Sequence, residues 1–301
     1  MIEVKKKNKK LKKIFIIVGS IFLVLVISFL FLLYGPYSGF RDFLITSSMT
    51  TKSHQYIAKF FYSDKTIDKV LKKNGIIEGD KSTDINLINI KKKKKSKTYK
   101  NEYEKQILDR SEDESLYKVI NVSGKTYQGY LVAIYDPSRV GIATTRYLGV
   151  RGEAIDNVAK RYGAVVAINA GGFYDPDWNS NGALPHGIVI ENGKVVSEYA
   201  KANVGGGMVG FTNDNKLVLG KFSKSEALNM GIRDAVEFGP FLIINGEASK
   251  VLGNGGWGIA PRTAIGQRQD GIVLFLVING RIPTSIGADM NDLIDIMQRY
   301  G

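Results

Sequence analysis

Residues 272–279 read IVLFLVIN, an apolar run that is closed by the dipeptide Asn279-Gly280. A short run rich in β-branched and aromatic residues, bounded by turn residues, is typical of a β-strand. Asn-Gly favours a hairpin, because both central positions of a type I′ turn need positive φ. Asn192-Gly193 and Asn245-Gly246 are dipeptides of the same kind. Between Leu116 and the end of the chain lie five more candidate strands: LVAIYD (131–136), AVVAIN (164–169), GIVIE (187–191), KVVSEY (194–199) and FLIIN (241–245).

Two segments of this region have helical rather than strand periodicity. Residues 153–162 place Ile155, Val158, Ala159 and Tyr162 at helical spacing and stop at Gly163, and residues 290–300 place Leu293, Ile294, Met297 and Tyr300 on one side. Asp289 is the expected N-cap of the second helix, and Gly301 its C′ residue. Residues 116–301 therefore predict an α+β domain, a mixed β-sheet with a few packed helices.

The preceding residues 35–115 divide into a helical part and a polar part. Residues 36–75 predict short amphipathic helices, with Asp64 as a cap and Asn74-Gly75 as a stop. Their aromatic face needs a partner, either the membrane surface or the distal domain. Residues 76–115 are charge-rich and predict a stalk. Within the helical part, the apolar residues of one face are Tyr56, Ile57, Phe60 and Phe61, and those of the other are Ile67, Val70 and Leu71.

Residues 14–34, IFIIVGSIFLVLVISFLFLLY, form an uncharged apolar run long enough to cross a membrane. A cleaved signal peptide is the alternative, but it has a shorter apolar stretch and a small-residue cleavage site, which the following YGPYSGFRDF lacks. We expect a retained signal anchor. The lysine-rich residues 1–13 then form a cytoplasmic tail by the positive-inside rule, and the C-terminal domain lies outside the cell at the membrane.

The net charge of +13 is concentrated in two short runs. Residues 1–13 carry seven lysines against Glu3, residues 91–100 (KKKKKSKTYK) carry seven more, and the rest of the chain is electrically balanced. A basic face that follows a phosphate backbone is therefore not expected, which excludes nucleic acid as a partner. The second run is either a solvated linker or a tether to anionic polymers or lipid headgroups.

The chain has no cysteine, so thiolate catalysis and cysteine-ligated metal sites are excluded. A Gly-x-Ser-x-Gly elbow, a Walker loop and a His-Glu-x-x-His motif are also absent from the sequence. Of the two histidines, His54 lies in the juxtamembrane helices and is expected to be structural. Candidate polar groups instead cluster at the ends of the predicted strands.

Four of these strand-end segments carry a resemblance when they are taken in order. They are AINAGGFYD (167–175), PHGIVIENGKVV (185–196), EFGPFLIINGE (237–247) and PRTAIGQRQDGIVLFLVINGR (261–281). Residues 116–301 resemble the phosphodiester glycosidase family, which includes the lysosomal uncovering enzyme and bacterial proteins of exopolysaccharide biosynthesis. The resemblance implies cleavage of a bond between C1 of a sugar and a phosphate. The family continues past the last helix into a strand that ends in Asn-Leu-Asp-Gly-Gly, which supplies an aspartate of the site. The resemblance therefore implies that residues 1–301 are either a fragment or a natural truncation without this aspartate, and we expect a fragment.

The implied chemistry needs a cation to hold the departing phosphate, together with a carboxylate or dipole and a positioned water. Arg262 is the first candidate for the cation and Arg281 the second; an ion pair of the β domain is the alternative for each. Asp289, Glu237 and Asn169 are candidates for the other catalytic groups, although Asn169 can equally cap a turn. Substrate contacts are expected from Gly171, Gly172, His186 and Trp257, where aromatic rings such as Trp178 and Trp257 can stack on sugars.

A cofactor is not required by these motifs, but one loop offers oxygen ligands. Asp175, Asp177 and Asn179 alternate as in a calcium loop, although the twelfth position, a glutamate in EF-hands, is His186. A looser site for a divalent cation, Ca or Mg, remains open against a polar active-site loop.

The predicted protein is thus a membrane-anchored extracellular hydrolase that cleaves a sugar-1-phosphodiester in a surface polysaccharide or teichoic-acid-like polymer. The alternative is a non-catalytic glycan-binding or assembly factor that keeps the fold. A membrane-anchored glycopolymer ligase shares the architecture, but it would need more arginines at its site than the two that these motifs supply.

Overall fold

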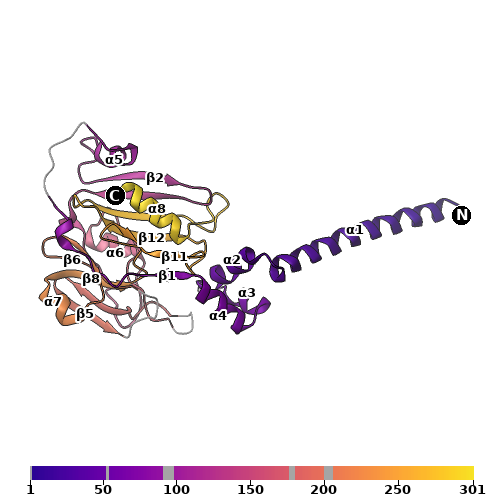
Figure 1. The fold of residues 1–301 in the computed structure, drawn as a ribbon, viewed down its shortest axis with the longest axis horizontal. Coiled ribbons are helices and arrows are strands. Elements are labelled where there is room, and N and C mark those ends of the chain that lie inside the picture. The colour runs from indigo at the N-terminus through magenta and orange to yellow at the C-terminus, as the bar shows by residue number, and fades with distance from the viewer. Residues whose placement is uncertain (1, 52–53, 91–97, 176–179, 200–205) are drawn as a thin grey trace. The chain divides into compact units, whose positions relative to one another are not determined.

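The computed structural model describes residues 2–51, 54–90, 98–175, 180–199 and 206–301 (Figure 1). The chain forms two compact units, Met1–Lys73 and Asn74–Gly301. The architecture is α+β, with antiparallel sheets in the second unit, as the sequence predicted. The boundary between the units differs from the predicted one, because residues 74–115 belong to the second unit rather than to a separate stalk.

The first unit is entirely helical. The long helix α1 (Ile2–Tyr34) contains a candidate membrane span by length and composition, Lys12–Tyr34, with a mean hydropathy of 3.1. Helices α2 (Ser38–Met49), α3 (Gln55–Phe61) and α4 (Asp64–Lys73) follow, so the predicted short amphipathic helices are confirmed. Asp64 is the first helical residue of α4 rather than its cap. Their common core consists of Leu33, Ile45, Ala58, Tyr62, Ile67 and Val70.

A four-stranded antiparallel sheet carries the first core of the second unit. Its order is β12 (Arg262–Gln267), β13 (Val273–Ile278), β3 (Gln128–Ile134), β2 (Tyr117–Ser123). Helix α8 (Met290–Tyr300) begins and ends where the sequence predicted, and Asp289 is its N-cap in a reciprocal capping box with Asp292. The buried face joins β3, β13 and α8 through Leu131, Ala133, Leu274, Leu276, Ile278, Leu293, Met297 and Tyr300.

A five-stranded antiparallel sheet packs on the other face. Its order is β5 (Lys194–Tyr199), β4 (Gly187–Glu191), β8 (Ile232–Phe238), β6 (Gly207–Thr212), β7 (Leu217–Gly220). Apolar side chains of β3, β13, β6 and β7 meet between the two sheets. Helix α7 (Lys224–Asn229) covers the far side of the second sheet through Ala227.

The residues predicted to be a stalk contribute to this unit through short elements. Strand β1 (Gly75–Ile77) pairs with β11 (Lys250–Leu252), and α5 (Glu102–Leu108) buries Ile107 fully in the first core. Tyr135 Oη donates a 2.6 Å hydrogen bond to the Ile107 carbonyl. The remaining short elements are η1 (Ile85–Leu87), η2 (Pro137–Arg139), α6 (Ile155–Tyr162), β9 (Ile243–Ile244) and β10 (Glu247–Ala248).

Three further sequence-based expectations differ from the structure. Residues 164–169 have no strand partner; Val166 and Ile168 pack on the core between the sheets, while Val165 is 72% exposed. Only two residues of FLIIN form a strand. At Asn279-Gly280 the positive φ falls on Arg281 instead, and a Cβ on Gly280 would lie 2.5 Å from the nitrogen of Pro261. Gly280 is needed there for close packing, not for a type I′ turn.

Candidate functional site

Arg262, the first residue of β12, has its guanidinium surrounded by backbone carbonyls. Nε donates to the Ala288 carbonyl at 3.3 Å, and Nη2 donates to the carbonyls of Gly258 (2.8 Å) and Trp257. Among the described residues no carboxylate forms an ion pair with Arg262, and Nη1 has no hydrogen-bond acceptor. Carbonyl oxygens orient the group without neutralising it. The ion pair considered from sequence is therefore not what holds this arginine.

The charges around Arg262 leave its positive charge poorly compensated. Burial lowers the pKa of Arg262 to about 10; the carboxylate of Asp289 opposes this shift, and the positive charge of Arg281 adds to it. Arg262 is still protonated at neutral pH. Asp289 and Arg281 thus act on Arg262 with opposite sign, and no ion pair among the described residues neutralises its guanidinium. Such an environment favours binding of an anion that can accept hydrogen bonds from the guanidinium.

The carbonyls that hold Arg262 come from the glycine-rich loop 253–258. Asn74, which is 4% exposed, accepts a 3.1 Å hydrogen bond from the Asn254 amide with its Oδ1. A Cβ on Gly253, whose φ is +58°, would lie 2.0 Å from that Oδ1. On its other side the loop touches Met290 at the start of α8, since a Cβ on Gly255 would lie 3.0 Å from its Cγ. The loop is therefore fixed from both sides, and its carbonyls are aimed at Arg262.

Asn169 contacts Thr263, the residue that follows Arg262 in β12. Thr263 Oγ1 donates a 2.7 Å hydrogen bond to Asn169 Oδ1, which ties the end of the 164–169 segment to the edge strand β12. The Asn169 side chain is exposed, and it meets β12 on the face of Thr263, because successive side chains of a strand point to opposite faces. The structure thus brings together three of the predicted residues, Arg262, Trp257 and Asn169.

Four other predicted residues form a neighbouring group at the end of β8: Gly171, Gly172, His186 and Glu237. A Cβ on Gly171 would lie 3.1 Å from Val236 of β8, and one on Gly172 would lie 3.3 Å from the His186 ring. The His186 amide donates to the Gly172 carbonyl at 2.9 Å. The two glycines thus allow other side chains of the protein, rather than a ligand, to approach the backbone closely.

Glu237 is 7% exposed within this second group. A Cβ on Gly187, where φ is +64°, would lie 2.2 Å from Glu237 Oε2, so the carboxylate occupies the space that a side chain would need. The rings of Phe238 and Trp257 meet edge-on at 6.5 Å and connect this group with the Arg262 group. Glu237 directly precedes Phe238, which makes the contact between the two groups, but its own side chain is buried inside the fold.

A cleft of about 1890 Å³ runs along this side of the second unit. Arg262, Asn169, Gly171, Gly172 and Trp257 line it. Its volume exceeds that of most small-molecule sites, so these residues occupy only one part of it. Four other predicted residues are not among the lining residues: Glu237, His186, Arg281 and Asp289.

The remaining two candidates have identifiable structural roles. Asp289 Oδ1 accepts from the Asp292 amide at 3.0 Å, as the cap of α8. Arg281 is exposed, has a φ of 60°, and donates its amide to the Ile286 carbonyl in the turn after β13. Both act on Arg262 through charge rather than through a direct hydrogen bond.

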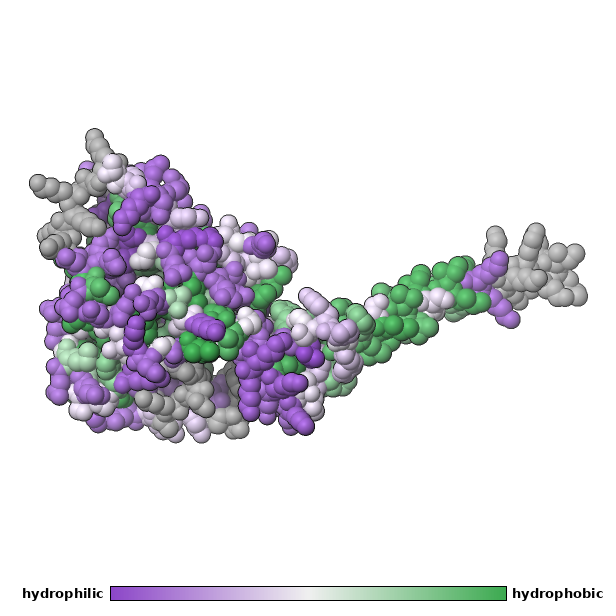
Figure 2. Space-filling view, in the orientation of Figure 1, coloured by the Kyte–Doolittle hydropathy of each residue, from purple (hydrophilic) through white to green (hydrophobic). Residues whose placement is uncertain are grey.

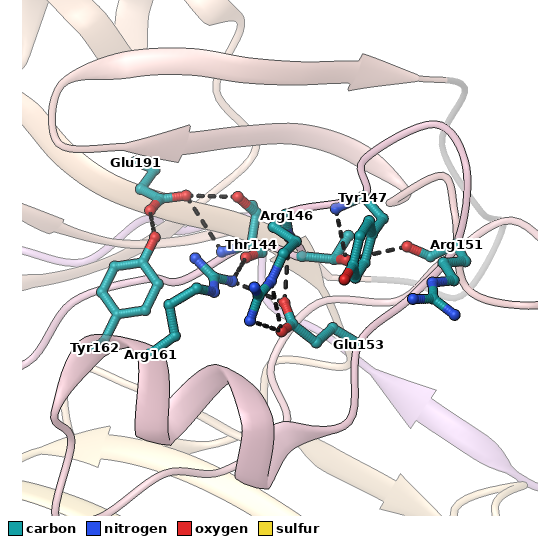
Figure 3. A network of polar contacts seen from close by, with 9 residues as sticks. Thr144, Arg146, Tyr147, Arg151, Glu153, Arg161, Tyr162 and Glu191 are labelled. Carbon is teal, nitrogen blue, oxygen red and sulfur yellow. Dashed lines mark hydrogen bonds and ion pairs between the residues drawn. The ribbon is translucent and has the colours of Figure 1, made fainter.

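A polar network fixes the segment that leads to Asn169 (Figure 3). Glu153 Oε1 accepts from Arg146 Nη2 at 3.0 Å, and Oε2 accepts from Arg161 Nη2 at 2.9 Å. Glu191, at the end of β4, accepts from Thr144 Oγ1 at 2.7 Å and from the Tyr162 hydroxyl. Because α6 carries Arg161 and Tyr162, both carboxylates anchor this helix just before residues 164–169.

The Glu153 carboxylate is stabilised in its charged form. Burial alone would raise the pKa of Glu153, but hydrogen bonds from the Arg146 amide and from the guanidinium groups of Arg161 and Arg146 together hold it below its usual value. Nearby, the Tyr147 ring is stacked by the Arg151 guanidinium at 4.2 Å from the ring centroid. The network is thus a structural support of the site.

The possible cation loop is only partly described. Asp175 Oδ1 accepts a 2.6 Å hydrogen bond from the Ser180 amide, while Asp177, Trp178 and Asn179 lie outside the described residues. Within the described part of the chain, three or more His, Cys, Asp or Glu side chains do not converge on a point that could hold a metal. The lysine run 91–95 likewise lies outside the described residues.

Sequence reasoning missed three residues that position the site. Thr263 follows the proposed arginine directly and was not singled out. Asn74 was interpreted as a helix stop, and Glu78 belonged to the segment predicted to be a stalk. Glu78 accepts hydrogen bonds from the amides of Gly206 (2.8 Å) and Phe241 (3.1 Å), next to Phe238 and the cis Gly239-Pro240 bond. A local sequence pattern does not reveal such long-range acceptors.

Residues 162–301 match the family model described as phosphodiester glycosidase. The match supports, for this part of the chain, the resemblance to that family that the sequence indicated. A relative from Bacillus subtilis (strain 168), the SPbeta prophage-derived uncharacterized protein YomE, is 29% identical over 199 residues, which are 62% of this chain and 30% of that protein. The matched region therefore spans less than a third of that relative's length.

A similar solved structure is the catalytic domain of zebrafish N-acetylglucosamine-1-phosphodiester alpha-N-acetylglucosaminidase, auto-inhibited by its pro-peptide. It is 19% identical, with a TM-score of 0.46 over 60% of this chain and 66% of that chain. The residues that match the family model, 162–301, include Arg262, Asn169, Trp257 and the rest of the predicted site.

Proposed function

We propose that the second unit hydrolyses a sugar-1-phosphodiester, with Arg262 as the group that binds the phosphate. The observation that carries this proposal is the Arg262 guanidinium, which is oriented by three carbonyls, lines the cleft, and has no ion-pair partner among the described residues. The match of residues 162–301 to the phosphodiester glycosidase family model supports a phosphate as the anion that it binds.

In this reaction the bond between C1 of the sugar and the phosphate oxygen breaks, and its electron pair leaves with the phosphate. Nη1 and the charge of Arg262 stabilise the departing phosphate monoester, as preorganised cations do for leaving groups. A water oxygen bonds to C1, and its proton passes to a carboxylate or to solvent. The Asn169 amide, held by Thr263, can orient the sugar or the water beside Arg262. Trp257 offers an aromatic ring at the same point of the cleft.

Replacing Arg262 tests this role. Arg262→Lys keeps the charge but loses the planar fork, and Arg262→Gln loses the charge, so we expect turnover of a GlcNAc-1-phosphodiester to fall about 10²–10³-fold or more in each. A matched GlcNAc glycoside without phosphate should not be cleaved by the wild type. Near wild-type turnover by Arg262→Gln would show that the phosphate is bound elsewhere, and Arg281 would be examined next.

A second function, glycan binding without catalysis, is favoured by one observation. The two candidate carboxylates are both engaged in the fold: Asp289 caps α8, and Glu237 is packed against Gly187 and does not line the cleft. Binding of a phosphorylated surface polysaccharide or teichoic-acid-like polymer that depends on Arg262, without release of a phosphate monoester, would establish this function instead. A divalent cation, if required, would be revealed by loss of turnover in the presence of a chelator.

We further propose that α1 anchors the protein in the cell membrane, with the lysine-rich tail in the cytoplasm and the second unit outside. The apolar span Lys12–Tyr34 supports the anchor, and the lysines before it support this orientation. Protease added to intact cells should digest the second unit and leave the N-terminus protected. An intact second unit in protease-treated spheroplasts, or a soluble form cut near Tyr34, would contradict the topology.

A further inference from the structure

Helix α3 of the first unit folds back beside the C-terminal end of α1. The Tyr62 hydroxyl donates to the Leu33 carbonyl at 3.0 Å, and the Tyr34 hydroxyl donates to the Phe61 carbonyl at 3.0 Å. The rings of Phe29 and Phe61 meet edge-on at 5.8 Å. These contacts fix the end of α3 against the last turns of α1.

The contact between Phe61 and Phe29 places the C-terminal end of α3 beside the last turns of the apolar span, rather than beyond its end. Phe29 lies five residues before Tyr34, the last residue of α1 and of the candidate span. At a rise of 1.5 Å per residue this corresponds to a depth of about 7.5 Å. Figure 2 shows the apolar residues as a continuous band along α1 up to its junction with the short helices. Helices that lie in a membrane interface are buried about 5–10 Å, which includes this depth.

The outward face of α3 is apolar at that depth. Phe60 is 80% exposed and Tyr56, one turn earlier on the same face, is 67% exposed. Among the described residues of 35–73, the other large apolar side chain with high exposure is Tyr37, which directly precedes α2. Lys59 lies between the two rings in sequence and can extend its ammonium group to lipid phosphates while its stem stays in the apolar layer.

Helix α4 has the opposite character and provides a contrast within the same unit. Its exposed side chains are charged, and it buries Ile67 and Val70. The exposed residues are Asp64, Lys65, Asp68, Lys69, Lys72 and Lys73. Among the described residues of α2, α3 and α4, the highly exposed aromatic side chains therefore belong to α3, the helix that lies against the apolar span.

We propose that α3 lies in the membrane interface at the C-terminal end of α1, with Tyr56 and Phe60 inserted among the lipids. The inference rests on the proposed membrane anchor and adds a second contact with lipid. Two observations select a lipid surface rather than a protein partner: the face is continuous with the span through Phe29 and Phe61, and its residues are aromatic with one lysine. Aromatic side chains with a polar tip or edge are enriched at this depth.

Because the sequence has no cysteine, single cysteines can test the inference by specific labelling. Four variants of the full chain are labelled with an environment-sensitive fluorophore in phosphatidylcholine–phosphatidylglycerol vesicles: Phe60→Cys and Tyr56→Cys on α3, Leu25→Cys in the span, and Lys69→Cys on α4. All four positions are exposed in the structure, so the fold tolerates the label. Quenching by lipid-attached doxyl groups and by aqueous iodide is then compared.

We expect doxyl quenching at positions 25, 60 and 56, and iodide quenching at 69. If positions 60 and 56 are quenched by iodide like 69 while 25 is quenched by lipid, the anchor stands and the interfacial placement of α3 is wrong. If 60 and 56 are shielded from both quenchers, another protein surface covers the face, which also overturns the proposal. If position 25 is not quenched by lipid, the anchor fails, and this inference fails with it.

Discussion

Thr263 Oγ1 donates a 2.7 Å hydrogen bond to Asn169 Oδ1, across 94 positions of the sequence. The contact joins the edge strand β12 to the end of the 164–169 segment, which has no strand partner of its own. Arg262 precedes Thr263 in the same strand and lines the same cleft as Asn169. A single hydroxyl group thereby links the two sides of the proposed catalytic site.

Thr263→Val removes this hydroxyl group while keeping a β-branched side chain in the strand. A neutral hydrogen bond contributes ~1 kcal/mol, so we expect kcat/KM for a sugar-1-phosphodiester to fall about fivefold. The thermal unfolding midpoint should change little, because the site is at the surface. Thr263→Ser keeps the donor and serves as the control. Equal kinetics for wild type and Thr263→Val would show that the orientation of Asn169 does not matter for turnover.

Glu78 should contribute to the stability of the second unit far more than a typical surface carboxylate. Its carboxylate accepts from the amides of Gly206 and Phe241, two residues that lie outside the strands of both main sheets. Glu78→Ala leaves these donors unsatisfied, and we expect the free energy of unfolding to fall by about 1–3 kcal/mol.

Glu247→Ala is the matched control for Glu78→Ala, because Glu247 is exposed and pairs with the equally exposed Lys81 at 3.3 Å. Exposed pairs contribute about 0–1 kcal/mol. Urea unfolding of both variants measures the difference. If the two variants lose the same amount, residues 74–90 are not a structural part of the second unit.

The features that could be predicted from the sequence are those set by nearby residues. Helix α8 and its Asp289 cap were predicted at their observed positions, because the capping box acts between residues three apart. The turns at Asn192-Gly193 and Asn245-Gly246 have the expected positive φ for the same reason.

The features that were missed depend on distant partners. Residues 164–169 have a strand-like pattern, but a strand also needs a neighbour that supplies hydrogen bonds, and this is not encoded locally. Asn74 follows a helix and was interpreted as its stop, yet its side chain is buried against the loop 253–258. For the site, the sequence indicated Arg262, whereas the carbonyls that orient it became visible only in the fold.

Binding of inorganic phosphate should stabilise the second unit through Arg262. Burial lowers the pKa of Arg262 to about 10, so the unbound protein holds a guanidinium whose charge is poorly compensated. A bound anion supplies that compensation, and ligand binding to the folded state raises the unfolding midpoint. We expect phosphate to raise the midpoint of the wild type in a concentration-dependent manner.

Arg262→Gln should abolish the phosphate effect, and Arg281→Gln should weaken it, because Arg281 acts on the site only through its charge. Differential scanning fluorimetry at constant ionic strength, with chloride as the reference anion, separates specific binding from screening. The same phosphate-induced shift in Arg262→Gln and wild type would place the anion site elsewhere.

Glu153 should make the stability of the second unit sensitive to acid. Its pKa is held below the usual value by the Arg146 amide and the two guanidinium groups, against the opposing effect of burial. The unfolded chain therefore binds a proton more readily than the folded one, so the stabilisation is fully present above the unfolded pKa of about 4.3 and is lost as the pH falls through the folded pKa. Glu153→Gln removes the titrating group, so its free energy of unfolding should decline less steeply below about pH 5.

The wild-type and Glu153→Gln curves should accordingly approach each other as the pH falls, with the wild type more stable at neutral pH. Glu198→Gln is a suitable control, because Glu198 forms a half-exposed surface pair with Lys224. This variant should keep the steep acid dependence of the wild type. Parallel curves for wild type and Glu153→Gln would mean that the network around α6 does not depend on the charge of Glu153, and that the support of residues 164–169 comes from the hydrogen bonds of Glu191 instead.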